Sequence, residues 1–180
     1  ISGTATVCEN DAQPDITFTN PQALPITITY NINGGAPMTI NVAASSSASV
    51  AAPTNVSGTY AYNLVSAVYQ SAPGCPNAIT GTATITVRPT PTATISGTIT
   101  VCQNDASPNI TFTNTSPLPI RIRYYINGAS STTINNVPAG GSVNVPVPTG
   151  TPGTFTYTFR DIRYNDNNPG CTVTPAGSAT

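Results

Sequence analysis

The 180-residue sequence contains no histidine, no lysine and no tryptophan, and only 6% of its residues are charged. Five arginines are set against six acidic residues, so the formal net charge is −1. A chain with so weak a field does not gather phosphates, which excludes nucleic acid as a partner. Histidine is the side chain that most often serves as a general base, and its absence leaves only a few carboxylates for catalysis. The sequence therefore predicts no enzyme and no cofactor.

Long apolar runs are missing as well. None approaches the roughly twenty residues that are needed to cross a bilayer. The chain also does not open, at Ile1, with the charged and then apolar pattern of a secretion signal. We expect any signal or membrane anchor to lie outside this sequence.

The residues that favour helices are scarce, and those that favour strands are abundant. Glutamate, leucine and methionine are rare, whereas threonine, valine, isoleucine and tyrosine recur throughout the chain. The 18 prolines and 14 glycines provide the many turns that short antiparallel strands require. The composition predicts an all-β protein.

Two stretches of the chain are nearly identical. Residues 1–20, ISGTATVCENDAQPDITFTN, return as residues 95–114, ISGTITVCQNDASPNITFTN, with four substitutions. The spacing of 94 residues is about the length at which a single domain buries its own core. We predict a first domain at 1–88, a Pro/Thr-rich linker at 89–94 and a second domain at 95–180, whose closing strand is truncated. The linker prolines favour an extended, semi-rigid conformation.

Alternating apolar residues mark the strands within each repeat. Residues 26–32 are apolar at every second position, Asn33-Gly34 forms a hairpin turn, and residues 38–42 alternate beyond it. Residues 43–52 are small and serine-rich and are predicted to form an edge strand or a loop. About seven short strands in each repeat favour two tandem immunoglobulin-like antiparallel β-sandwiches joined by the Pro/Thr linker.

Aromatic residues recur at equivalent places in the two repeats. Tyr60 and Tyr62 follow a glycine in the first repeat, and Phe155 and Tyr157 follow one in the second. We expect these rings to anchor the two cores. Tyr62 or Tyr157 is also a candidate for the tyrosine corner, in which a hydroxyl bonds the backbone a few residues upstream.

Four cysteines occupy equivalent positions, Cys8 and Cys75 in the first repeat and Cys102 and Cys171 in the second. Four cysteines allow three pairings. Because the repeats should fold alike, we predict one bridge in each, Cys8–Cys75 and Cys102–Cys171. Disulfides indicate an oxidising compartment outside the cytoplasm.

Three carboxylates of the first repeat, Glu9, Asp11 and Asp15, lie close together in the sequence and are the candidates for a calcium site. Their counterparts in the second repeat include Gln103 and Asn109, so the full set of charges is not repeated. The alternative is a solvated turn in which Asp11 and its counterpart bond nearby backbone amides.

The second repeat carries a basic patch that the first lacks. Arg121, Arg123 and Arg160 replace two threonines and a valine on strands that face solvent. The patch is a candidate site for an anion or a glycan. The alternatives are protection of a sheet edge and pairing with Asp161. Asn-x-Ser/Thr triplets, which matter only in a host that glycosylates them, begin at Asn55, Asn109 and Asn114.

The run SGT-x-TVC-x-ND-x-x-P-x-ITFTN, followed by LPI, a tyrosine and ING, resembles repeats of very large cell-surface adhesins of gliding and related Bacteroidota. The resemblance covers both repeats. It implies immunoglobulin-like or PKD-like modules in long stalks that are exported by type IX secretion, in some cases with a gliding-motility-associated sorting domain. No sorting domain is visible in this sequence.

The resemblance implies a structural stalk or filament segment of a long extracellular adhesin on a bacterial cell surface. Its partners would be neighbouring repeats of the same array or fibre, with surface glycans or other cells as further candidates. The alternatives are a carbohydrate- or protein-binding module and a filament subunit assembled by strand addition. The chain ends do not coincide with the ends of a repeat, so we expect the sequence to belong to a longer array.

Overall fold

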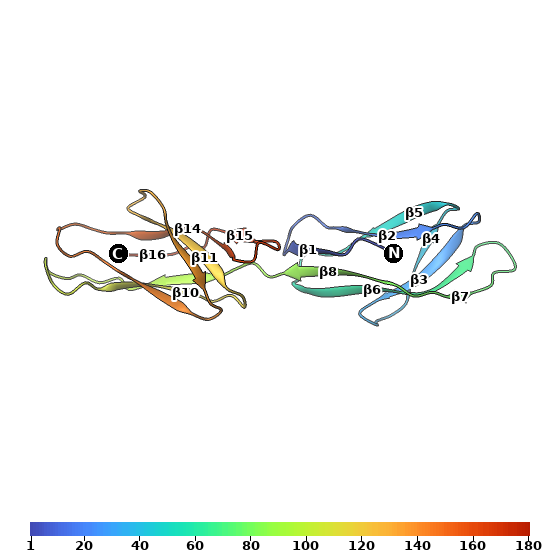
Figure 1. Ribbon diagram of the computed structural model, residues 1–180, viewed down its shortest axis with the longest axis horizontal. Coiled ribbons are helices and arrows are strands. Elements are labelled where there is room, and N and C mark those ends of the chain that lie inside the picture. The colour runs from blue at the N-terminus through green and yellow to red at the C-terminus, as the bar shows by residue number, and fades with distance from the viewer. The chain divides into compact units, whose positions relative to one another are not determined.

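The computed structural model describes residues 1–180 and contains only β-strands as regular structure, which confirms the all-β prediction. The chain divides into two compact units, Ile1–Pro89 (unit 1) and Thr90–Thr180 (unit 2). Each unit is a sandwich of two sheets, as the alternating patterns predict, and Figure 1 labels most of their strands. The strands of unit 1 are β1 (Ala5–Cys8), β2 (Asp15–Asn20), β3 (Ile26–Ile32), β4 (Met38–Val42), β5 (Ser46–Ala51), β6 (Gly58–Tyr69), β7 (Asn77–Ala78) and β8 (Thr82–Arg88). Those of unit 2 are β9 (Ala93–Ser96), β10 (Asn109–Asn114), β11 (Ile120–Ile126), β12 (Thr132–Val137), β13 (Ser142–Pro146), β14 (Tyr157–Tyr164), β15 (Thr172–Val173) and β16 (Ser178–Ala179).

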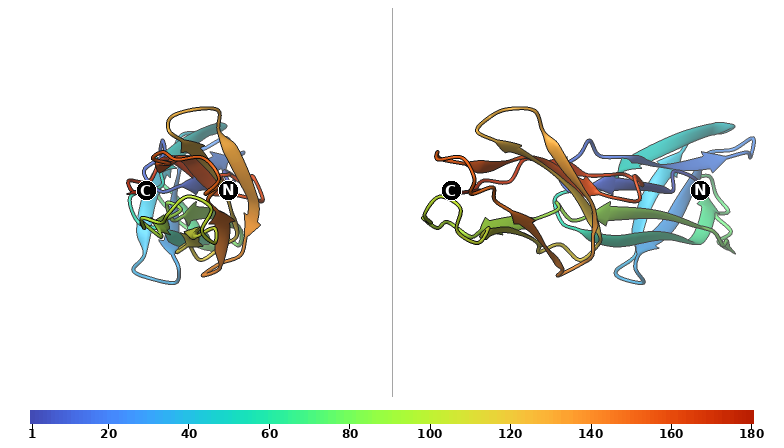
Figure 2. Two further views of the ribbon diagram at one scale, coloured as in Figure 1. Left: turned by 90° about the vertical axis from the view of Figure 1, so that its left-hand side faces the viewer. Right: turned by 60° about the vertical axis from the view of Figure 1, so that its left-hand side comes forward.

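In unit 1 the larger sheet has the order β1-β8-β6-β3-β4, with β7 added beside β6. The smaller sheet is the antiparallel pair β2 and β5. The right-hand view of Figure 2 shows this pair, in blue and teal, on the opposite side of the unit from the green strands β6 and β8. The serine-rich stretch 43–52 thus contains a strand. One pairing departs from the expected antiparallel order, because β1 runs parallel to β8, with Ala5 opposite Ile85 and Val7 opposite Val87.

Unit 2 has the same two layers, but the strands at the margins of its sheets differ from those of unit 1. Its larger sheet has the order β12-β11-β14-β15, with β16 also pairing with β14, and its smaller sheet has the order β13-β10-β9. Strand β9 pairs with β10, so Ala93 and Thr94, which lie in the predicted linker, are sheet residues of unit 2. The division between the units falls after Pro89.

The core of each unit is built from the inward residues of the alternating strands, because period-two spacing places them on one face of a sheet. Phe18 is fully buried in unit 1, with its ring centroid 4.8 Å from that of Tyr30, and Tyr30 stacks on Tyr62 at 6.2 Å. In unit 2, Phe112 lies 4.7 Å from Tyr124 and also contacts the edge of Phe159 at 5.7 Å. The predicted core role is confirmed for Tyr62 and Tyr157, which are almost fully buried, whereas Tyr60 and Phe155 are only half-buried.

The tyrosine corner was predicted at Tyr62 or Tyr157, but the hydroxyl that bonds the upstream backbone belongs to Tyr60. Tyr60 donates to the carbonyl of Val56, four residues upstream, at 2.9 Å. Tyr62 and Tyr157 point into the cores instead and are almost fully buried. Burial raises the pKa of both phenols, with the nearby tyrosines Tyr30 and Tyr124 adding to the effect.

A β-bulge lies at the same place in both units. In unit 1 the register between β3 and β6 shifts between Thr29 and Tyr30, which leaves Val65 as the extra residue. In unit 2 the shift between β11 and β14 follows Arg123 and leaves Arg160 as the extra residue. A bulge turns two successive residues of one strand away from the core, and here they are the bulged residue and the one after it.

A buried asparagine closes the second sheet in each unit. Asn20 is fully buried, and its amide donates to the carbonyls of Leu24 and Ala43 at 3.0 and 2.9 Å. Its side-chain oxygen accepts from the backbone of Gln22. Asn114, equally buried, makes the equivalent set of bonds in unit 2. These bonds satisfy backbone groups that the loop after the strand would otherwise bury without partners.

Candidate functional site

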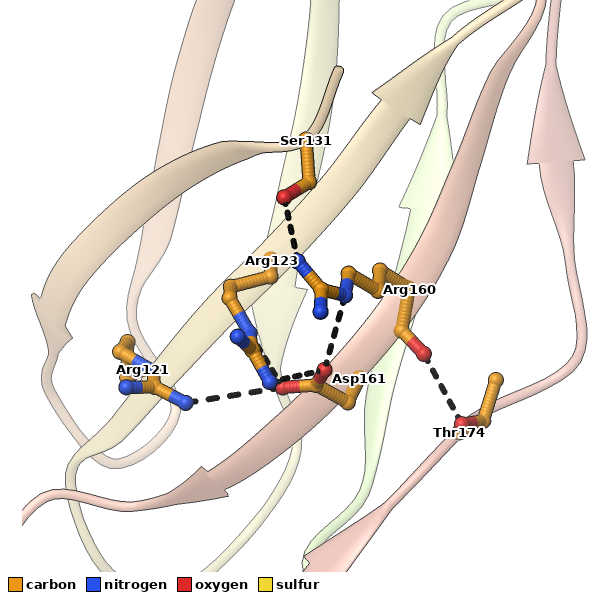
Figure 3. Close-up of polar contacts among 6 residues, drawn as sticks. All are labelled: Arg121, Arg123, Ser131, Arg160, Asp161 and Thr174. Atoms are coloured by element: carbon orange, nitrogen blue, oxygen red, sulfur yellow. Dashed lines mark hydrogen bonds and ion pairs between the residues drawn. The ribbon is translucent and has the colours of Figure 1, made fainter. Parts of the chain in front are cut away.

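The basic patch of unit 2 is organised around one carboxylate. Asp161 lies opposite Arg123 in the register of β11 and β14, and the bulge turns it outward beside Arg160. Arg123 donates through Nε to Oδ1 at 2.8 Å and through an Nη to Oδ2. Arg121 and Arg160 approach the same carboxylate at 3.6 and 3.7 Å, and Figure 3 shows the three arginines converging on it. Arg160 also donates to the hydroxyl of Ser131 at 2.7 Å.

The patch holds more positive charge than Asp161 neutralises. Arg163 stands directly opposite Arg121 in the strand register, so four arginines share this face with one acid. The Nε groups of Arg121 and Arg163 are buried and have no hydrogen-bond partner. Burial, with the charges of Arg163 and Arg123, lowers the pKa of Arg121, whereas the bond to Asp161 raises the pKa of Arg123. Of the three arginines around Asp161, Arg160 is the most exposed, with 41% of its side chain exposed.

Pairing with Asp161, one of the predicted alternatives for these arginines, is confirmed for Arg123. Protection of a sheet edge is not their role, because β11 and β14 are inner strands of the sheet. Sequence reasoning missed Arg163 in the patch. Its position two residues after Asp161 on an alternating strand was the available signal.

The three carboxylates of the candidate calcium site are not gathered. The carboxylate of Asp11 accepts from the backbone amide of Cys8 at 3.0 Å, and Asp15 begins β2 opposite Ala51. No group of three His, Cys, Asp or Glu side chains lies close enough together to hold a metal ion. The prediction of calcium at Glu9, Asp11 and Asp15 is therefore wrong. The alternative, a turn in which Asp11 bonds a backbone amide, is confirmed, and Asp105 repeats it with Cys102.

The predicted cysteine pairing is also wrong. Cys75 and Cys102 carry free, exposed thiols, whereas Cys8 and Cys171 are disulfide-bonded. In unit 1 the reason is the length of β6. Cys8 lies opposite Arg88, next to the start of β6, and Cys75 follows the far end of that strand. Twelve extended residues span on the order of 35 Å, whereas bonded cysteines have Cα atoms about 4–7 Å apart.

Strand β14 separates the cysteines of unit 2 in the same way. Cys102 lies beside the segment that precedes β14, where its neighbour Gln103 bonds the carbonyl of Gly150. Cys171 directly follows Gly170, whose carbonyl accepts from Tyr164 at the end of β14. Each unit therefore carries its two cysteines at opposite ends, which rules out a bridge within a unit.

Two cavities lie beside the chain ends, one in each unit. A cavity of about 330 Å³ in unit 1 is lined by residues that include Ile1, Asn20, Tyr69 and Cys75. A groove of about 280 Å³ in unit 2 is lined by residues that include Ile99, Val101, Cys102, Phe155 and Thr180. Neither was predicted from the sequence, because each is lined by residues that are far apart in the chain.

The three glycosylation triplets differ in access. Asn55 and Asn109 are exposed, whereas Asn114 is fully buried and its amide is engaged in hydrogen bonds. The folded unit therefore offers Asn55 and Asn109 but not Asn114 to a glycosylating enzyme.

The chain contains no helix with the length and apolar character that a membrane crossing requires.

No protein-family model and no curated protein matches the chain. Among solved structures, the chain is similar to a Ca²⁺-stabilised ice-binding adhesin of an Antarctic bacterium, with 22% identity and a TM-score of 0.44 over 100% of this chain and 48% of that one. It is also similar to a 1.5-MDa bacterial ice-binding adhesin, with 21% identity and a TM-score of 0.46 over 100% of this chain and 62% of the other. A domain of a biofilm-associated protein aligns at 17% identity and a TM-score of 0.32, over 98% of this chain and 28% of that one. The chain thus spans less than two thirds of each of these structures.

Proposed function

We propose that the chain is a load-bearing spacer from the stalk of a long extracellular repeat protein, an adhesin on a bacterial cell surface. The observation that carries this proposal is the parallel pairing of β1 with β8. These are the first and last strands of the larger sheet to be reached along unit 1, so a pull on the two ends of the unit moves them in opposite directions. All bonds of the ladder are then loaded together in shear, whereas an antiparallel end pair would open one bond at a time.

Further features support a structural role. The cores, bulges and buried asparagines are kept in both units, whereas the surface residues that would form a binding site are not. The low charge and the bonded cysteines suit a secreted protein in an oxidising compartment.

Single-molecule stretching of the full chain under reducing conditions tests the proposal. Unit 1 is expected to unfold at a higher force than unit 2, whose segment at Ile99 and Val101 forms no strand and bonds the closing segment from the Ile99 amide to the Thr180 carbonyl. Each event should release on the order of 300 Å, the length of about ninety extended residues. Unfolding of unit 1 at or below the force of unit 2 would contradict the proposal.

To assign the two force peaks, we would weaken each unit separately by a core substitution, Phe18→Ala in unit 1 or Phe112→Ala in unit 2. Both side chains are fully buried and equivalent, so each variant should lower one peak and leave the other unchanged.

A second candidate function is recognition of an acidic saccharide by unit 2. The observation in its favour is the excess of positive charge on this face, where four arginines accompany one acid. A sulfated or uronic-acid glycan would supply oxygens for the exposed parts of these arginines, such as Arg160, 41% of whose side chain is exposed. An array of neutral and acidic glycans probed with the full chain is expected to give salt-sensitive signals on the acidic members alone.

The variant Arg121→Ala should abolish those signals. The matched control is Thr27→Ala in unit 1, since Thr27 occupies the equivalent position on β3 and should have no effect. Silence of the unmodified chain on acidic glycans, or equal binding by the two variants, would exclude this function while leaving the spacer proposal intact.

A further inference from the structure

The two cysteines of each unit lie at opposite ends of that unit. In unit 1, Cys8 lies at the end where the chain leaves, opposite Arg88, and Cys75 lines the cavity at Ile1, where the chain enters. In unit 2, Cys102 lines the groove at Thr180. The first cysteine of each repeat therefore belongs to the end where the chain leaves the unit.

Cys171 occupies the entering end of unit 2. It follows Gly170, whose carbonyl accepts from Tyr164, and the next residue, Asn165, donates to the carbonyl of Pro119. The loop before Pro119 is bonded to the incoming chain, where the hydroxyl of Ser116 donates to the carbonyl of Thr92. The second cysteine of each repeat thus belongs to the end where the chain enters.

The bonding states follow this arrangement. The first cysteine of unit 1 and the second cysteine of unit 2 are disulfide-bonded. Their counterparts, Cys102 and Cys75, are free and exposed. The two thiols that lack a partner thus lie at the entering end of unit 1 and at the leaving end of unit 2.

We propose that Cys75 and Cys102 are the two halves of an intermolecular staple, and that each bonds the other type of cysteine in a further copy of this repeat. The inference rests on the proposed spacer function and adds to it a covalent link from one repeat to the next. Each repeat pair would then be bonded covalently to a further copy through one cysteine at each of its ends. Such a link keeps the junction closed when load would draw neighbouring units apart.

The chemistry is ordinary thiol oxidation. The Cys75 and Cys102 thiols lose two protons and two electrons as their S–S bond forms, and a small-molecule or protein disulfide accepts them and is reduced to two thiols. Both sulfurs are on exposed loops, so they are open to the exchange that this reaction requires. In an oxidising compartment, exposed thiols of this kind do not persist unpaired.

The test uses the full chain in two variants that each retain one free thiol. Cys75→Ser keeps Cys102, and Cys102→Ser keeps Cys75, while Cys8 and Cys171 are unchanged. One variant is labelled with ¹⁵N, and the two are mixed in equal amounts in a glutathione redox buffer. Mass spectrometry under non-reducing conditions then counts the mixed dimer and both dimers of like chains.

The staple predicts that the ratio of mixed dimers to dimers of like chains, which is one for random pairing, rises about tenfold or more, which corresponds to ~1.4 kcal/mol of complementarity between the two ends. Peptide mapping should identify a Cys75–Cys102 bond, and the unsubstituted chain should form a ladder of covalent multimers that a reductant dissolves. A random distribution of mixed and like dimers, or the absence of dimers, would overturn the proposal. The stretching experiment is done with reduced thiols, so its outcome is independent of this one.

Discussion

The two units are copies of one sandwich, yet each is open where the other is filled. In unit 1, β8 lies between β1 and β6 and buries Ala83, Ile85 and Val87 almost completely. In unit 2 the equivalent strand, β16, covers only Ser178–Ala179, and the groove beyond it is open. Ile99 and Val101, the counterparts of two β1 residues, are exposed there.

At the opposite end of the sandwich, unit 2 is filled and unit 1 is open. In unit 2, β9 pairs Ala93 with Asn114 and Thr94 with Thr113. In unit 1 only the single bridge from Ser2 to Thr17 remains, and the space next to it is the cavity at Ile1. Each sandwich therefore has a strand at one end that pairs less or not at all in the other, and a cavity or groove lies at that place in the other unit.

The largest expected effects on the stability of the two units come from substitutions in their cores. Phe18→Ala and Phe112→Ala should each cost their own unit about 3–5 kcal/mol of unfolding free energy, because both rings are fully buried. The loss should be larger for Phe112 by about 0.5–1.5 kcal/mol, since it also contacts Phe159. Hydrogen exchange followed separately in each unit measures both values. Equal losses would show that the ring of Phe159 contributes no stability through this contact.

Filling the groove of unit 2 should remove most of the difference between the units. Adding a copy of residues 85–89 after Thr180 supplies a segment equivalent to the second half of β8, and burial of its isoleucine and valine should stabilise unit 2 by about 3 kcal/mol after the cost of ordering the chain. The control extension carries serine at those two positions. Hydrogen exchange in unit 2 measures the gain, and equal effects of the two extensions would contradict a strand-accepting groove.

The buried asparagines should behave alike in the two units. Asn20→Ala and Asn114→Ala each leave buried backbone carbonyls without donors, which should cost about 2 kcal/mol in either unit. Chemical denaturation with exchange detection provides the comparison. A clear difference between the two variants would mean that the loops after β2 and β10 are not held in the same way.

The smallest expected effect concerns the hydroxyl that distinguishes Tyr60 from its counterpart Phe155. Tyr60→Phe removes the bond to the carbonyl of Val56, which is exposed, so unit 1 should lose only about 0.5–1 kcal/mol. Thermal unfolding of the full chain, with Tyr69→Phe as the control for loss of an exposed hydroxyl, measures it. A loss above ~2 kcal/mol would mean that the bond from Tyr60 to the carbonyl of Val56 stabilises unit 1 more than its exposure suggests.

Local features of this fold were predictable from the sequence. The hairpin at Asn33-Gly34 is one example, since both residues adopt positive φ angles of 53° and 74°, which Asn and Gly tolerate. The alternation in residues 26–32 likewise fixed which side chains of β3 are buried.

Features that join distant parts of the chain were not predictable. The parallel pairing of Ala5 with Ile85 connects residues from the two ends of a unit, and no local pattern encodes its direction. The ends occupied by Cys8 and Cys75 depend on the direction in which β6 crosses the sandwich. In the arginine patch, Arg121 and Arg123 followed from alternation, but the approach of Arg160 to Asp161 depends on a bulge.

That bulge has an evolutionary consequence. It turns Val65 outward in unit 1 and Arg160 outward in unit 2, while the aromatic and aliphatic residues on either side remain in the core. Mutation at this point alters what the repeat displays and leaves its stability nearly untouched, because the substituted side chain contacts water. Duplicated repeats can therefore drift apart in surface chemistry at the bulge under little selection from folding, and a new recognition property can arise in one repeat while its neighbours keep the ancestral role.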